Sequence, residues 1–176
     1  METDLKRTVR DWVWRSAQME GYAAGIAYHL SRSLLLRPEE RDWARDTILP
    51  QEIGHRDMLA DLAARLGRPL PRLLPTPSIQ DLGDCHALML LTRAEGALVL
   101  QSKKFRAIFQ PLGEEALAVF EQILREEQGH RAWSRGVVFR LMQEGHLVPA
   151  KVLESFPPFH VNRALERTIW THEEAS

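Results

Sequence analysis

Six residues of two types, glutamate and histidine, recur along this sequence at spacings that suit metal binding. In chain order they read Glu, Glu-x-x-His, Glu, Glu-x-x-His, and they are Glu20, Glu52, His55, Glu95, Glu127 and His130. Residues three apart on a helix project to the same side, so each Glu-x-x-His pair offers a carboxylate and an imidazole together. Such nitrogen and oxygen ligands without thiolate suit iron or manganese. The pattern predicts a site for two metal ions, with one histidine for each.

The six residues fall into two halves that share one sequence offset. Glu20 and Glu52 are 32 residues apart, and so are Glu95 and Glu127. An offset of 75 residues relates the members of three pairs, which are Glu20 and Glu95, Glu52 and Glu127, and His55 and His130. Such an internal repeat predicts two helical hairpins, each carrying half of the site. Gly54 and Gly129 repeat at the same offset, and we interpret these helix-weakening residues as points of close packing.

Apolar residues around these positions recur every three or four residues, which predicts helices whose inward faces carry the six polar side chains. The predicted helices cover approximately residues 5–36, 38–66, 79–109 and 114–144. Leu34 and Arg45 also fall on inward positions of this pattern. Pro50 lies two residues before Glu52 and should kink or restart the second helix, because proline removes a helical hydrogen bond.

The predicted architecture is all-α, an antiparallel four-helix bundle with one long connection. Residues 67–78 contain four prolines, so they cannot form a regular helix and must connect the second helix to the third. The bundle domain covers residues 1–145. Residues 146–176 form a C-terminal extension that we expect to pack on the bundle, with a short helix near residues 161–172.

The negative charges of four glutamates on inward helix faces must be neutralised. A bare carboxylate in a core is costly, so these side chains require either a cation or protonation. The alternative interpretation is a plain bundle with satisfied polar core residues. Nearby residues have similar pairs of interpretations: we read Tyr28 and Trp133 as core aromatics rather than electron relays. We expect the Thr92 hydroxyl to face solvent or to bond the backbone rather than to hold a water or a bound oxygen species. We expect Arg56 to form an outward salt bridge rather than to steady a ligand.

The set Glu20, Glu52-Ile-Gly-His55, Glu95 and Glu127-Gln-Gly-His130 resembles the di-iron site of the ferritin-like superfamily. The 32-residue steps and the long crossover look most similar to those of rubrerythrin and bacterioferritin relatives, over about residues 5–145. The resemblance implies that Glu20 and Glu95 are terminal carboxylate ligands, that Glu52 and Glu127 bridge, and that His55 and His130 are terminal imidazoles. Rubrerythrins carry a further glutamate where this chain has Leu98, and a paired-cysteine iron centre where it has only Cys85.

The function implied is a di-iron oxidoreductase that activates O2 to oxidise a small organic substrate, with the six residues as catalytic ligands. Its cofactor would be two iron ions, with manganese–iron or two manganese ions as alternatives, and an external electron donor would reduce it. One alternative function is a ferroxidase that feeds an iron store. Another is a rubrerythrin-like peroxide reductase, which Leu98 and the lone Cys85 disfavour.

Composition limits the partners and the location. The chain has 176 residues, 23 basic and 24 acidic side chains, and no basic run, so nucleic-acid binding is not expected. No apolar stretch approaches the ~20 residues of a membrane span, and the N-terminus lacks a signal-peptide pattern. The single Cys85 fits a reducing compartment. We therefore expect a cytoplasmic protein, with a homodimer as one assembly that it could form.

Overall fold

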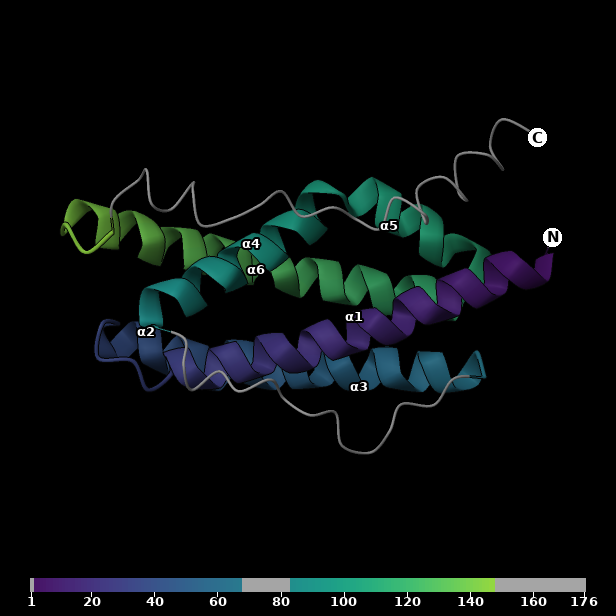
Figure 1. Cartoon of the computed structure of the whole chain (residues 1–176), viewed down its shortest axis with the longest axis horizontal. Coiled ribbons are helices and arrows are strands. Elements are labelled where there is room, and N and C mark those ends of the chain that lie inside the picture. Colours follow the sequence, from purple (N-terminus) through teal and green to yellow (C-terminus); the bar gives the residue numbers. More distant parts are fainter. Residues whose placement is uncertain (1, 68–82, 148–176) are drawn as a thin grey trace.

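The computed structural model describes residues 2–67 and 83–147, which are mostly helical and contain no strand (Figure 1). The elements in chain order are α1 (Glu2–Leu30), α2 (Pro38–Trp43), the π-helical segment η1 (Ala44–Ile48), α3 (Leu49–Arg65), α4 (Asp84–Leu100), α5 (Ser102–Phe109), the 3₁₀ turn η2 (Gln110–Leu112) and α6 (Glu114–Gln143). The prediction of an all-α protein is therefore confirmed for this part of the chain.

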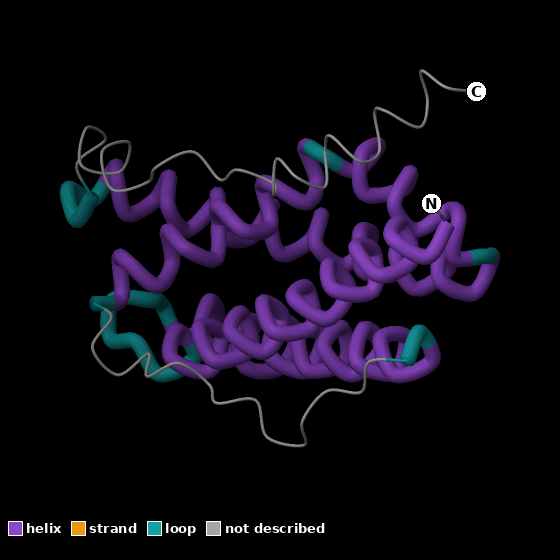
Figure 2. The backbone as a smooth tube through the Cα atoms, turned by 45° about the vertical axis from the view of Figure 1, so that its right-hand side comes forward, coloured by secondary structure: helices purple, strands orange, loops and turns teal. Residues whose placement is uncertain are grey.

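The long helices pack in two pairs. α1 lies along α3, and α4 lies along α6. Figures 1 and 2 show these pairs as two layers, with α1 and α3 in one layer and α4, α5 and α6 in the other. Further contacts of α1 with α4 and of α3 with α6 join the layers. Each pair contains one half of the sequence repeat, as two helical hairpins would.

Two separate hydrophobic clusters hold the layers together. One cluster contains Ile26, Ile48, Leu88, Leu91 and Val137, and the other contains Val13, Leu59, Phe109, Phe120 and Ile123. On each of the four long helices the predicted metal ligands lie between the residues of one cluster and those of the other. Burial of each large apolar side chain stabilises the fold by roughly 1.5–3 kcal/mol, so both clusters anchor the helices on either side of a polar centre.

The first helix is shorter than its pattern predicts. α1 ends at Leu30 rather than near Leu36, and Leu34, expected to face inward, is 92% exposed. The Ser33 hydroxyl accepts a hydrogen bond from the Leu35 backbone N–H and donates one to Asp84 on α4. Serine competes with helical hydrogen bonding in this way, and the chain turns here before α2 begins at Pro38.

The region around Pro50 forms a widened helical turn rather than a break. Across η1 the Leu49 backbone N–H bonds the carbonyl of Ala44, five residues back, and Pro50 occupies the first turn of α3, where its missing N–H does no harm. A π turn carries one extra residue, which shifts the helical register. Arg45 is consequently exposed, contrary to the prediction, whereas Ala44 and Ile48 are buried.

The third predicted helix is divided, while the fourth is confirmed. α4 ends at Leu100, and Gln101, with φ −105° and ψ 17°, separates it from α5. The turn at residues 110–113 is present as η2, followed by Gly113 with φ +100°, a conformation that favours glycine. Residues 68–82, which hold most of the long connection, and the extension beyond residue 147 lie outside the described residues.

Candidate metal centre

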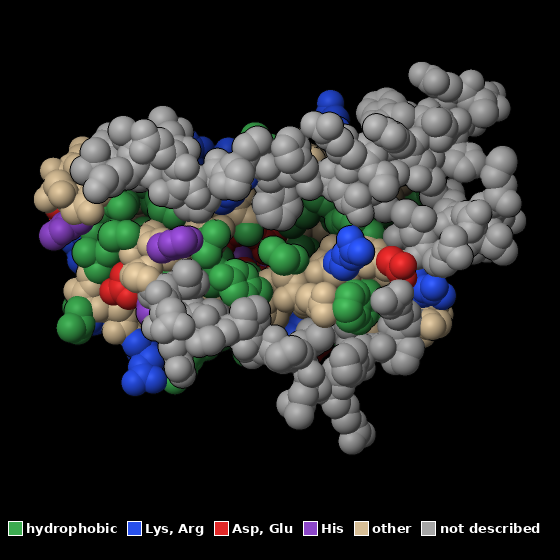
Figure 3. All heavy atoms as spheres, in the orientation of Figure 1, with side chains coloured by type: hydrophobic (Ala, Val, Ile, Leu, Met, Phe, Trp, Pro, Cys, Tyr) green, Lys and Arg blue, Asp and Glu red, His purple; other side chains and the backbone are tan. Residues whose placement is uncertain are grey.

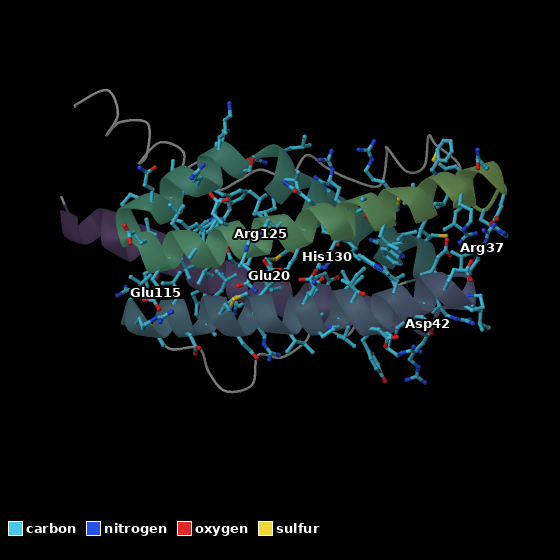
Figure 4. The ribbon with its side chains drawn as sticks, turned by 180° about the vertical axis from the view of Figure 1, so that it is seen from behind. Glu20, Arg37, Asp42, Glu115, Arg125 and His130 are labelled. Carbon is cyan, nitrogen blue, oxygen red and sulfur yellow. The ribbon has the colours of Figure 1, made fainter. Side chains whose placement is uncertain are left out.

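The structure brings together all six residues predicted to bind metal. α1 supplies one glutamate, α4 another, and α3 and α6 each supply a Glu-x-x-His pair, so the set is Glu20, Glu95, Glu52 with His55, and Glu127 with His130. Figure 4 shows Glu20 and His130 near the middle of the long helices. The side chains of Glu52, His55 and His130 are completely buried, whereas that of Glu20 is 16% exposed.

The residues form two overlapping groups that could hold metal ions. One group is Glu20, Glu52, His55 and Glu127, and the other is Glu52, Glu95, Glu127 and His130. Within each group one ligand atom from every residue lies within 4.8 Å of the others. Glu52 and Glu127 belong to both groups. Each group therefore combines three carboxylates with one imidazole, and two carboxylates lie between them.

The histidines present the same ring nitrogen to this centre. His55 Nδ1 lies 3.3 Å from Glu127 Oε1 and 3.7 Å from Glu52 Oε2. His130 Nδ1 lies 3.1 Å from Glu52 Oε1 and 3.7 Å from Glu127 Oε1. The two ring centroids are 5.9 Å apart. Nδ1 is thus the nitrogen available to a metal, and Nε2 of each ring points away from the shared carboxylates.

Several polar atoms of the centre are buried without a hydrogen-bond partner. In the described part of the chain, both carboxylate oxygens of Glu52, one of Glu95, and Nδ1 of His55 and of His130 are buried without a hydrogen bond. The histidine–carboxylate approaches are close but lack hydrogen-bond geometry. Buried polar atoms are nearly always paired, and an unpaired one costs about 1–3 kcal/mol. Because these atoms meet in one place and are metal-ligand types, the residues fit bound metal ions.

Without metal, protons partly compensate the shared charge. Burial would lower the pKa of both histidines, but contacts with Glu127 and Glu52 outweigh it and raise the pKa of His55 to about 11 and that of His130 to about 10. Burial would raise the pKa of Glu52, but contacts with His130 and His55 lower it to about 2. The metal-free centre therefore pairs cationic imidazoles with the ionised carboxylate of Glu52.

Glu20 and Glu95 behave differently from Glu52. Burial, and then the negative charges of Glu52 and Glu127, raise the pKa of Glu20 well above its usual value. Burial and the charge of Glu127 do the same for the pKa of Glu95. The Ser134 hydroxyl also donates a hydrogen bond of 3.2 Å to Glu95 Oε2. A metal ion would reverse these shifts, since it stabilises the ionised form of every ligand.

The residues that hold the histidines were missed in the sequence. His55 Nε2 lies 2.9 Å from Glu126 Oε2, and His130 Nε2 lies 2.8 Å from Gln51 Oε1. Gln51 and Glu126 each precede the glutamate of a Glu-x-x-His pair and share the repeat offset of 75 residues, which is the signal that could have found them. Arg56 instead bonds Asp57 at 2.8 Å and forms the expected outward salt bridge.

The structure also tests the interpretations of a threonine and two aromatic residues near the centre. The Thr92 hydroxyl donates a hydrogen bond to the backbone carbonyl of Leu88 at 2.7 Å, which is one of the two alternatives expected for it. Trp133 packs in the core, stacked on Trp43 with 5.5 Å between ring centroids, whereas Tyr28 is 52% exposed and is not a core aromatic. Trp43 was not singled out in the sequence, yet its ring meets that of His130 edge-on.

The two glycines inside the Glu-x-x-His turns do not mark close packing. A Cβ added at Gly54 or at Gly129 would meet nothing within 4 Å, so this interpretation of the sequence is wrong.

Figure 3 shows acidic and histidine atoms recessed between hydrophobic side chains near the middle of one face. The side chain of Glu20 is 16% exposed, so the centre is not fully sealed.

No family model, curated protein or solved structure matches this chain. The likeness to a ferritin-like di-iron site therefore depends on the helical structure and on the buried glutamate and histidine groups. None of the described helices is long and apolar enough to cross a membrane.

Proposed function

We propose that this protein is a ferritin-like di-iron oxidoreductase, built on an antiparallel four-helix bundle, that uses O2 to oxidise a small organic substrate. One observation carries the proposal: two buried three-carboxylate, one-imidazole groups share Glu52 and Glu127. Two metal ions bound in adjacent groups would share those two carboxylates. The nitrogen and oxygen donor set without thiolate supports iron, with manganese as the alternative.

Each residue has a role that follows from its position. Glu52 and Glu127 would bridge, while Glu20 with His55 and Glu95 with His130 would complete the two sides of the centre. When bound, two iron ions would supply a pair of electrons to O2 and polarise it. The buried histidines and apolar clusters limit water around the centre, which suppresses side reactions. The partly exposed Glu20 side is the route that we assign to O2 and substrate.

The first test is metal content. We expect about two irons per chain after anaerobic loading with Fe(II), exposure to air and desalting, measured by elemental analysis with the molar mass of the same sample. Glu95→Ala should lose at least one of them, because Glu95 completes one group. The matched control is Glu115→Ala, which removes a glutamate that is 72% exposed (Figure 4) and should keep both irons.

The outcomes discriminate between functions. A folded wild-type protein, checked by circular dichroism, that retains no iron would refute the proposal. Many irons per chain on a large shell would indicate an iron store instead. Reoxidation of the reduced centre by hydrogen peroxide much faster than by O2 would favour a peroxide reductase. Two irons on a small assembly, with fast reoxidation by O2, would support the enzyme and justify substrate screening.

A further inference from the structure

The two halves of the centre differ in the residue that contacts the outer nitrogen of each histidine. Gln51 and Glu126 are related by the 75-residue offset that relates the ligands themselves. Each residue contacts the histidine of the other hairpin. Glu126 on α6 contacts His55 on α3, and Gln51 on α3 contacts His130 on α6. The two contacts have nearly equal lengths of 2.9 and 2.8 Å. The geometry is thus the same in both halves, but one partner is a carboxylic acid residue and the other is an amide.

This difference changes how strongly each imidazole can donate electrons. With Nδ1 of each ring bound to a metal ion, Nε2 would carry the ring hydrogen and donate it to the partner oxygen. A carboxylate accepts a roughly twofold stronger hydrogen bond than a neutral amide does. A carboxylate partner also raises the basicity of a metal-bound histidine. His55, held by Glu126, is therefore the stronger ligand, and His130, held by Gln51, is the weaker one.

A hydrogen bond to Glu95 adds to the difference in ligand strength between the His55 group and the His130 group. The Ser134 hydroxyl lies 3.2 Å from Glu95 Oε2 and 3.3 Å from the Arg131 backbone carbonyl oxygen, and it shares its one hydrogen between them. Donation to Glu95 withdraws electron density from a carboxylate that belongs to the His130 group. Glu126 is held in place in turn by the Gln122 side-chain amide, whose Nε2 lies 3.2 Å from Glu126 Oε1. Its carboxylate is only a quarter exposed, so solvent weakens the contact with His55 only in part.

We propose that Gln51 and Glu126 are positioning residues that make the two metal positions chemically unequal. The position bounded by Glu20 and His55 binds the first metal ion more tightly and favours the higher oxidation state, and the position bounded by Glu95 and His130 fills second. This inference rests on the proposed dinuclear centre. It concerns residues that would not touch the metal themselves but act through the histidines.

The experiment is a stepwise titration with Co(II), followed by visible absorption and by competition with a chelator, which needs neither O2 nor substrate. We expect two separated binding steps in the wild type. Glu126→Gln should weaken the first step by about 10–100-fold, the usual cost of losing such a partner, and bring the two steps together. Gln51→Glu should strengthen the second step by a similar factor, also bringing the steps together.

A second readout distinguishes electronic tuning from a merely structural role. In the iron-loaded protein the midpoint potential should rise in Glu126→Gln and fall in Gln51→Glu, since a stronger donor stabilises the oxidised metal. Charge-matched controls are Asp57→Asn and Gln128→Glu, which alter exposed side chains on α3 and α6. Both controls should leave the two steps and the potential unchanged.

The outcomes separate this inference from the proposed function. A folded wild-type protein that takes up no Co(II) would refute the dinuclear centre itself. Two bound Co(II) ions in the wild type, with step separation unchanged in both Glu126→Gln and Gln51→Glu, would overturn the inference alone. So would equal shifts in the Asp57→Asn and Gln128→Glu controls, because net charge would then explain the effect. Opposite potential shifts in the two test variants, absent from the controls, would support it.

Discussion

Loading the metal-free protein with two divalent ions should release protons, because its ligands hold protons that metal displaces. Contacts with Glu127 and Glu52 outweigh burial and raise the pKa of His55 to about 11 and that of His130 to about 10. Both imidazoles are therefore protonated near neutral pH, whereas a metal-bound imidazole must be neutral. The two histidines alone account for about two protons per metal pair. Glu20, whose pKa is also raised, adds to this number.

The assay is calorimetric titration with Zn(II) near neutral pH in two buffers that differ in ionisation enthalpy. The difference in heat gives the number of protons released directly. The overall affinity for the metal pair should also rise by about two logarithmic units per pH unit from neutral pH toward the histidine pKa values. The exposed-site variant Glu115→Ala should release the same number of protons as the wild type.

One result would refute this reasoning. If two Zn(II) ions bind and fewer than about one proton leaves, the imidazoles are neutral before metal arrives. The shared carboxylates would then not hold the histidines in their cationic form, and the electrostatic description of the metal-free centre would be wrong. The test does not depend on which metal the protein uses or on its reaction.

Three further predictions concern stability. The pKa values of His55 and His130 in the folded protein lie above the unfolded value near 6.5, so their stabilising contribution is complete below that pH and is lost as the pH rises toward about 10 and 11. Calorimetry should show the melting temperature of the metal-free protein falling over this pH window. A rising melting temperature would contradict this account. Leu91→Ala removes a fully buried side chain and should cost about 2–5 kcal/mol in urea unfolding, whereas a loss below about 1 kcal/mol would mean that the cluster collapses to fill the space. Gly113→Ala should lower the free energy of unfolding by about 1–2 kcal/mol, because the backbone φ there is +100°. Gly129→Ala lies in a helix with open space at Cβ and should raise the free energy of unfolding by up to about 1 kcal/mol. Changes of the same sign in the two variants would contradict this account.

Local periodicity explains why the amino-acid sequence alone locates the six residues that meet in the candidate metal centre. A Glu-x-x-His pair is placed on one face by helix geometry alone, and the 75-residue repeat indicates that two such halves combine. The all-α class, the helix over residues 114–144 and the turn at residues 110–113 follow from the same local rules. The functional assignment goes further than these rules and remains a proposal.

Tertiary structure decided what depends on contacts between helices or on hydrogen bonding that competes with the helix. Ser33 ends α1 early by bonding to α4, and the π turn before Pro50 rotates Arg45 outward, which no apolar spacing shows. The contacts of Gln51 with His130 and of Glu126 with His55 join different hairpins. Spacing along one helix determines which face a residue occupies, but the relative register of two packed helices determines which residue it meets there.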